Sequence, residues 1–213
     1  ALELKDQDGI PAYYNETLRD VVVRTLALNA RSQAAALTGI GNGTIVFVDD
    51  PGLSACGSRL HLSISRNAVV DDLNLIFDAI RSEGALTGVH SCEAIDWSLL
   101  TDSAVDIISV DVYRYADSLI PYAAELRKFL ARGGVAAWGI VPTLDDPFAE
   151  TPASLQNRLS GIWEAIFPAG FDRETLIRQS LITPACGTGL LSEAQSVRVY
   201  ELTAAVSRRI RSA

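Results

Sequence analysis

The chain has few residues of the types that bind zinc best, and two of these residues lie close together in the sequence. Its 213 residues include two histidines and three cysteines. His90 and Cys92 lie two residues apart in the segment VHSCE, at the end of an apolar run. If a β-strand continues through this segment, both side chains point to the same face, because residues i and i+2 of a strand share a face. An imidazole beside a thiolate suits zinc, although two buried core residues would give the same spacing.

Four further candidate residues also follow apolar runs. Asp49 and Asp50 close TIVFVDDP, Asp111 lies near the end of VDIISVDV, and Cys186 follows SLITPA. If these runs are parallel strands, their carboxyl ends gather at one rim, where α/β proteins collect functional residues. Cys186 would then complete a metal site with the HxC pair, and Asp111 would offer an oxygen ligand. A histidine, two cysteines and a carboxylate form a reasonable zinc set.

The elements that must position these residues alternate along the chain. Apolar and β-branched runs predict strands at 44–51, 85–90, 105–112, 135–141 and 180–185. Helical spacing of apolar residues predicts helices at 15–38, 68–84, 96–103, 118–134, 151–170 and 192–213. Such alternation is typical of an α/β fold with parallel strands and helical crossovers. The first run, 44–51, has the composition of a strand buried on both faces.

Periodicity leaves two α/β architectures open, a doubly wound sheet and a (β/α)8 TIM-type barrel. A closed barrel needs eight strands, so five strands and a leading helix would form a barrel that is incomplete at its N-terminal side. No linker divides the chain, and we expect residues 1–213 to form a single domain. The open strand edges of such a barrel need cover, from a second copy or from other residues.

Composition narrows the partners and the compartment. The formal net charge is −8 and the sequence pI is about 4.7. No basic run occurs, which argues against nucleic acid or an anionic membrane as a partner. No apolar stretch reaches membrane-spanning length and no leader is evident, so we expect an unprocessed cytoplasmic protein. Three widely spaced cysteines favour thiols or metal ligands over a disulfide scaffold.

Taken in order, these segments resemble the catalytic barrel of cobalamin-independent methionine synthase. IVFVDDPGL resembles that family's DEP strand end, and VHSCE resembles its HxC zinc motif. DIISVD resembles the strand that presents a glutamate ligand, and LITPACGTGLLS resembles the NPDCG motif with the last zinc cysteine. The resemblance covers about residues 44–213. The wider superfamily, which includes uroporphyrinogen decarboxylase and methylcobalamin:coenzyme M methyltransferases, has a (β/α)8 barrel.

The resemblance implies a function and a role for each residue. His90, Cys92 and Cys186 would bind Zn2+, and Asp111 stands where the synthases have a glutamate ligand. Asp49 would bind the amino group of an amino-acid thiol, and Asp50 replaces the glutamate of DEP. The implied reaction is zinc-dependent transfer of a methyl group onto a thiol, with homocysteine becoming methionine.

Departures from the family pattern leave the methyl donor and the function class open. The segment VPTLDDPFAE does not reproduce the synthases' YDIHSPR loop, so the donor is either a methyl-folate or methylcobalamin. One alternative is transfer linked to a corrinoid protein or to coenzyme M, and another is a non-catalytic metal-binding barrel remnant. A homo-oligomer would cover the open edges. The second histidine, His61, is expected on a strand or loop face without a metal role.

Overall fold

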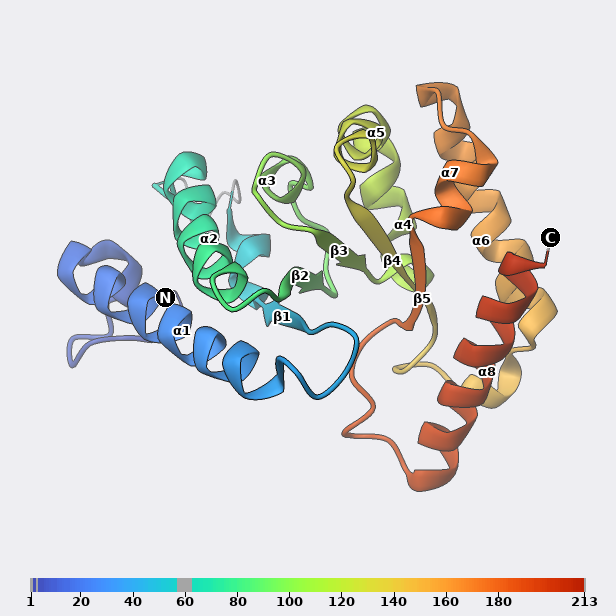
Figure 1. Ribbon diagram of the computed structural model, residues 1–213, viewed down its shortest axis with the longest axis horizontal. Helices are drawn as coiled ribbons and strands as arrows, with labels where there is room; N and C mark the ends of the chain where they lie inside the picture. The colour runs from blue at the N-terminus through green and yellow to red at the C-terminus, as the bar shows by residue number, and fades with distance from the viewer. Residues whose placement is uncertain (1, 3, 57–62, 213) are drawn as a thin grey trace.

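Five parallel strands form the centre of the molecule (Figure 1). The computed structural model describes residues 2, 4–56 and 63–212. The strands follow one another in the sheet in chain order, and every neighbouring pair is parallel. They are β1 (Ile45–Asp49), β2 (Leu86–Ser91), β3 (Ile107–Val110), β4 (Val135–Val141) and β5 (Ser180–Pro184). These observations confirm the α/β class and the parallel sheet.

Helices precede, connect and follow the strands. The α-helices are α1 (Glu16–Leu37), α2 (Arg66–Arg81), α3 (Ser98–Thr101), α4 (Val112–Leu119), α5 (Ala123–Ala131), α6 (Pro152–Ile166), α7 (Arg173–Arg178) and α8 (Glu193–Arg211). Short 3-10 turns are η1 (Ala12–Tyr14), η2 (Pro51–Ala55), η3 (Ile120–Tyr122), η4 (Pro147–Ala149) and η5 (Phe167–Ala169).

The strand order differs from that of a doubly wound sheet, one of the two architectures that the sequence left open. A doubly wound sheet reverses its direction of growth, whereas here each new strand joins the same edge. Since crossovers are right-handed, growth in one direction keeps the connecting helices on one side. Figure 1 shows them in an arc from α1 to α8. The sheet is therefore singly wound, and among the described residues β1 and β5 remain its two edges.

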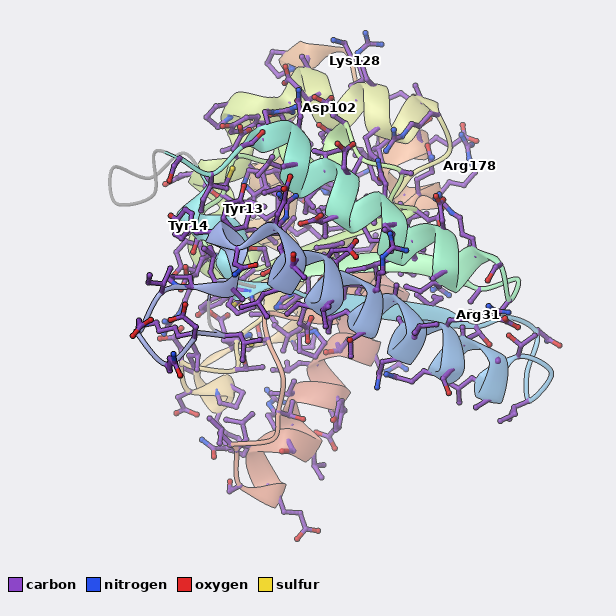
Figure 2. The ribbon with its side chains drawn as sticks, turned by 90° about the vertical axis from the view of Figure 1, so that its left-hand side faces the viewer. Tyr13, Tyr14, Arg31, Asp102, Lys128 and Arg178 are labelled. Atoms are coloured by element: carbon purple, nitrogen blue, oxygen red, sulfur yellow. The ribbon has the colours of Figure 1, made fainter. Side chains whose placement is uncertain are left out.

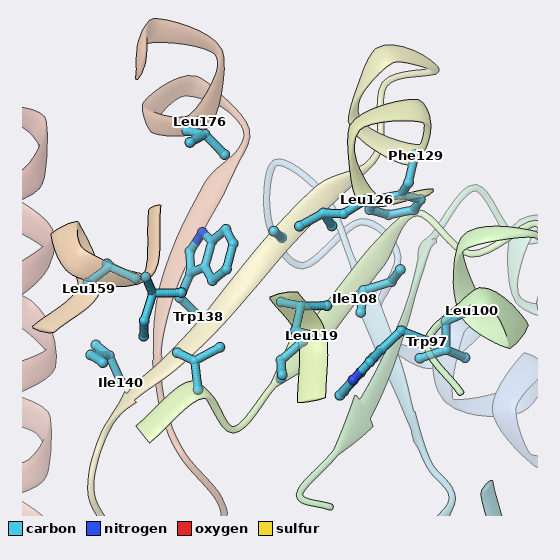
Figure 3. Close-up of a cluster of buried hydrophobic side chains, with 14 of the residues drawn as sticks. Trp97, Leu100, Ile108, Leu119, Leu126, Phe129, Trp138, Ile140, Leu159 and Leu176 are labelled. Carbon is cyan, nitrogen blue, oxygen red and sulfur yellow. The ribbon is translucent and has the colours of Figure 1, made fainter. Parts of the chain in front are cut away.

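Aromatic and branched side chains fill the space between the sheet and this arc of helices (Figure 3). Trp138 on β4 packs edge-on against Trp163 on α6, with ring centroids 6.0 Å apart. Each indole is fully buried, and burial of a large apolar side chain contributes roughly 1.5–3 kcal/mol. The Nε1–H of Trp138 donates to the Ser180 Oγ at 2.7 Å, which satisfies its polar atom and ties β4 to β5.

A smaller apolar cluster attaches α1 to α2 and β1. The Asn15 side chain caps α1 by accepting from the Leu18 N–H. Ala27, Ala30 and Ala34 allow a close approach to the neighbouring elements, since each has only a methyl group. Charged contacts add to this packing, because Arg31 near the end of α1 pairs with Glu83 at 2.6 Å. Figure 2 shows α1 and α2 side by side, with Arg31 toward the C-terminal end of α1.

The prediction that the first strand is buried on both faces is wrong. Ile45 and Phe47 of β1 are 43% and 42% exposed, whereas Val46 between them is buried. Val46 faces the helices, so Ile45 and Phe47 lie on the opposite face of an edge strand. The same face of β2 carries Leu86, which is 51% exposed. The apolar composition of a run therefore does not show whether both faces of the strand are covered.

The prediction of one helix over 118–134 is also wrong. The structure has α4, then η3, then α5. Pro121 lies within η3 and lacks the N–H that a continuous helix needs, and Tyr115 inside α4 departs from helical dihedrals. The strand predicted at 105–112 is shorter, because Asp111 already caps α4. The short helix α7 was not predicted.

Two further expectations concern membranes and the second histidine. Among the described helices, none combines the length and the apolar composition needed to cross a membrane. His61 lies outside the described residues.

Candidate metal centre

The register of the sheet places His90 in a row of side chains on the face away from α1 and α2. His90 pairs with Asp49 on β1 and with Ser109 on β3, and Ser109 pairs with Ala137 on β4. Paired residues on neighbouring parallel strands share a face. Asp49 and Ser109 therefore flank His90 near the carboxyl ends of the strands.

The structure brings together three of the residues predicted to bind zinc. One ligand atom from each of His90, Cys92 and Cys186 lies within 4.8 Å of the other two. All three residues are partly buried, and both cysteines are free. Ligands around a tetrahedral zinc ion lie roughly 3.3–3.8 Å apart, given its bond lengths. Two thiols and an imidazole are ligands that zinc binds, and their separations exceed those of a formed site by at most about 1–1.5 Å.

The imidazole of His90 shows the clearest sign of a missing partner. Its Nδ1 lies 3.0 Å from the Ser109 Oγ, whereas its Nε2 is buried and has no hydrogen-bond partner among the described residues. A buried polar atom without a partner costs about 1–3 kcal/mol. If Nδ1–H donates to Ser109, the Nε2 lone pair is free to bind a cation, and the serine fixes the ring. Nε2 is thus the nitrogen suited to a metal.

The two thiols lie close together in the candidate site. Burial raises the pKa of the Cys92 thiol, and the adjacent Cys186 raises that pKa further. The thiol of Cys92 is therefore held in its protonated form at neutral pH. A bound cation would reverse this preference, so that metal binding releases a proton from the site.

The predicted carboxylates occupy different positions around the three residues. Asp111 is only 2% exposed, and its carboxylate accepts from the Arg114 N–H at 3.0 Å as the cap of α4. Burial raises the pKa of Asp111 above its ordinary value. The backbone N–H groups that donate to its carboxylate act in the opposite direction but do not cancel this effect. Asp111 is not part of the 4.8 Å group, and its role as a ligand stays a prediction.

The two aspartates after β1 differ in what they contact. Asp49 is exposed and adjacent to His90 in the register. Asp50 is less exposed, and its Oδ1 accepts from the Gly52 N–H at 2.8 Å as the cap of η2. The binding role of both residues stays a prediction.

Sequence reasoning missed two polar residues on the strands of the sheet. Ser109 supports His90, and the available signal was a polar residue inside the otherwise apolar run DIISV. Thr183 on β5 carries a buried Oγ1 without a hydrogen-bond partner among the described residues. Neither residue is part of a recognisable sequence motif, because the alignment of neighbouring strands decides which residues they lie beside.

Comparison with protein-family models and with curated proteins finds no match to this chain.

Proposed function

We propose that this protein is a zinc-dependent methyltransferase that moves a methyl group onto a thiol, with homocysteine as the acceptor and methionine as the product. One observation carries the proposal. His90, Cys92 and Cys186 come from two distant parts of the chain, yet their ligand atoms lie within 4.8 Å of one another at the carboxyl edge of a parallel sheet. That edge is where α/β proteins place their chemistry.

The three protein ligands would leave one tetrahedral position for the substrate. Zinc, when bound, supplies the acidity that makes a substrate thiol react as a thiolate at neutral pH. Cys92 and Cys186 would add two negative charges and keep the centre electron-rich. Ser109 holds His90 through Nδ1 and leaves Nε2 to bind the metal.

Asp49 supports an amino-acid thiol as the acceptor. Its carboxylate is exposed, and Asp49 is the last paired residue of β1, beside His90 on the same face. A carboxylate in that place would attract the ammonium group of homocysteine while the sulfur lies at the metal. An acceptor without an amino group, such as coenzyme M, would give Asp49 no cation to bind.

We also propose that the singly wound sheet is part of a (β/α)8-type barrel. The face opposite the helices carries Ile45, Phe47 and Leu86, each more than 40% exposed. Apolar side chains on that face and an unpaired β1 edge favour cover by additional strands or by a second copy. A cytoplasmic location agrees with this proposal, because a reducing compartment keeps Cys92 and Cys186 as thiols.

Metal content and methyl transfer test the function together. Purified protein should hold close to one zinc per chain, and Cys186→Ala should lose it while the fold is retained. The zinc-loaded wild type should methylate homocysteine with either methyl-folate or methylcobalamin as the donor. Asp49→Asn should raise the KM for homocysteine. The methyl donor that works identifies the donor class, and activity only with a methylated corrinoid protein would identify a protein partner.

Other outcomes separate the alternatives. Methylation of coenzyme M with no dependence on Asp49 would favour the corrinoid-linked reaction. Stoichiometric zinc without transfer to any thiol would favour a non-catalytic metal-binding protein. A folded wild-type chain that binds no zinc would refute the proposed mechanism.

A further inference from the structure

The pairing of β4 with β5 is irregular near the carboxyl ends of the two strands. Gly139 pairs with Thr183, but the next pair joins Val141 to Pro184, so β4 advances two residues while β5 advances one. The Ala185 N–H then donates to the Val141 carbonyl at 2.8 Å. A residue inserted on one strand bends the pair locally, and such bulges often redirect residues beside functional sites.

Gly139 lies under this bend. A Cβ atom at position 139 would lie 2.7 Å from the Val110 carbonyl oxygen, 3.0 Å from the Ala185 Cα and 3.1 Å from the Pro184 carbonyl oxygen. All three are backbone atoms, so no side chain can rotate away to make room. The Pro184–Ala185 segment therefore crosses β4 at a distance that only a glycine permits.

This crossing ends one residue before the third cysteine. Cys186 directly follows Ala185, and the Cys186 thiol lies within 4.8 Å of the ligand atoms of His90 and Cys92. β4 and β3 separate β5 from β2, so a straight exit would carry the chain away from these two residues. We propose that Gly139 is a positioning residue for the metal centre, because the close crossing that it permits brings the Cys186 thiol to His90 and Cys92.

The proposal rests on the metal centre of the proposed function, and Gly139→Ala tests it without an activity assay. Adding one methyl group must displace the backbone around it, which comprises the Val110 carbonyl and the Pro184–Ala185 segment that leads to Cys186. We expect affinity for Co2+ or Zn2+ to fall roughly 10- to 100-fold, the range typical when support for a ligand is lost. In the Co2+-loaded variant, the sulfur-to-cobalt charge-transfer absorption should fall to that of Cys186→Ala.

A second readout does not depend on metal binding. A trivalent arsenical binds two thiols that lie close together, so it should bind Cys92 and Cys186 of the metal-free wild type. Gly139→Ala should bind it as weakly as Cys186→Ala does. If the wild type binds no metal, the proposed function fails, yet this readout still decides the role of Gly139.

Gly161→Ala is the matched control. Gly161 lies within α6, and a Cβ there would meet nothing within 4 Å. This variant should keep the wild-type affinity for metal and for the arsenical. Its result separates the close crossing from any general effect of replacing glycine by alanine.

A double-mutant cycle excludes a purely structural explanation. If Gly139 acts through Cys186, the variant with both substitutions should bind metal as weakly as Cys186→Ala alone. Additive losses would overturn the proposal, and so would unchanged thiol proximity in a folded Gly139→Ala. If that variant does not fold, Pro184→Gly loosens the same segment without adding an atom. Unchanged affinity for metal and arsenical in Pro184→Gly would then overturn the proposal.

Discussion

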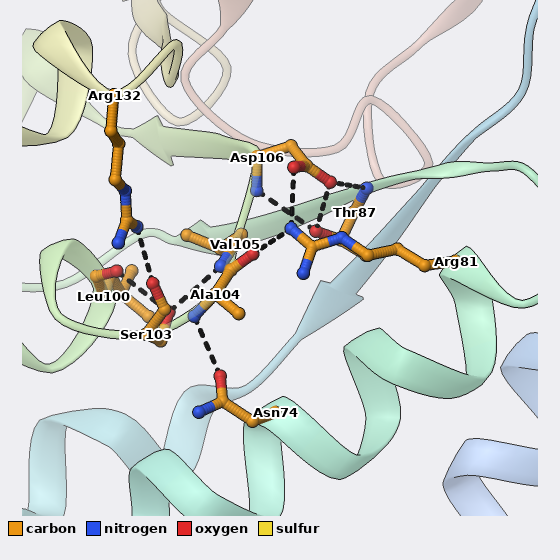
Figure 4. A network of polar contacts seen from close by, with 9 residues as sticks. All are labelled: Asn74, Arg81, Thr87, Leu100, Ser103, Ala104, Val105, Asp106 and Arg132. Carbon is orange, nitrogen blue, oxygen red and sulfur yellow. Dashed lines mark hydrogen bonds and ion pairs between the residues drawn. The ribbon is translucent and has the colours of Figure 1, made fainter.

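Asp106 is the residue whose replacement most directly tests how the strands beneath the site are held together (Figure 4). It precedes β3, and its carboxylate accepts from Arg81 of α2 at 2.6 Å. The same carboxylate accepts from the Thr87 N–H at 2.8 Å and from the Thr87 hydroxyl at 2.7 Å on β2. Asp106 thus joins two strands and a helix through three donated hydrogen bonds.

The expected loss in Asp106→Asn follows from these contacts. An asparagine oxygen can still accept from Thr87, but its NH2 group has no lone pair for Arg81. Hydrogen bonds to charged groups contribute about 1.5–3 kcal/mol. Arg81 is 35% exposed, so water replaces part of what is lost. We expect the free energy of unfolding to fall by about 2 kcal/mol, which lowers Tm by roughly 4–8 °C in a chain of this size.

The pH dependence of this difference has a definite sign. Burial by itself would raise the pKa of Asp106, but the bonds from Arg81 and Thr87 together hold the pKa below its ordinary value. A carboxyl group whose folded pKa is lowered stabilises the fold above its unfolded pKa of about 3.9. That contribution is lost as the pH falls through the folded pKa. The gap in the free energy of unfolding between wild type and Asp106→Asn should therefore be constant near neutral pH. It should narrow below about pH 4.

Urea unfolding of both proteins between pH 7 and pH 3 measures this gap. Asp102→Asn is the control, because Asp102 pairs with Arg66 at 2.5 Å but is 57% exposed. An exposed ion pair contributes at most about 1 kcal/mol, so its replacement should have a small effect. A gap at pH 7 no larger than that of the control, or a gap that does not narrow in acid, would refute the reasoning.

Three further predictions follow from individual contacts. Ser109→Ala removes the partner of His90 Nδ1 and should weaken zinc binding about 10- to 100-fold, measured by competition with a chelator; unchanged affinity would contradict the role assigned to Ser109. Asp111→Ala removes the cap of α4 and should lower stability by about 0.5–2 kcal/mol, whereas Asp111→Asn should retain most of it in thermal unfolding; equal losses would argue against capping. Leu159→Ala opens a cavity in the main core and should cost about 2–5 kcal/mol in urea unfolding, and a loss below 1 kcal/mol would contradict its burial.

Strong local patterns in the sequence predicted most of the elements. The run 135–141 is β4 without any change in its bounds, and the predicted helix over 15–38 differs from α1 by one residue at each end. The apolar residues of each segment follow a single periodicity, and the helix begins at a clear cap. Local interactions decide both features. The region 112–122 was predicted poorly, because Pro121 and the cap at Asp111 divide it in ways that apolar spacing does not reveal.

For the site, the sequence determined which residue types stand near the strand ends, namely His90, Cys92 and Cys186. The sequence could not show that these three residues meet, because their proximity depends on the strand order and on the register shift between β4 and β5. Ser109 and Gly139 matter only through neighbours that are remote in sequence. The exposure of Phe47 likewise follows from β1 being an edge strand. Local spacing specifies elements and chemistry, whereas packing between distant segments decides which residues meet and which faces remain open.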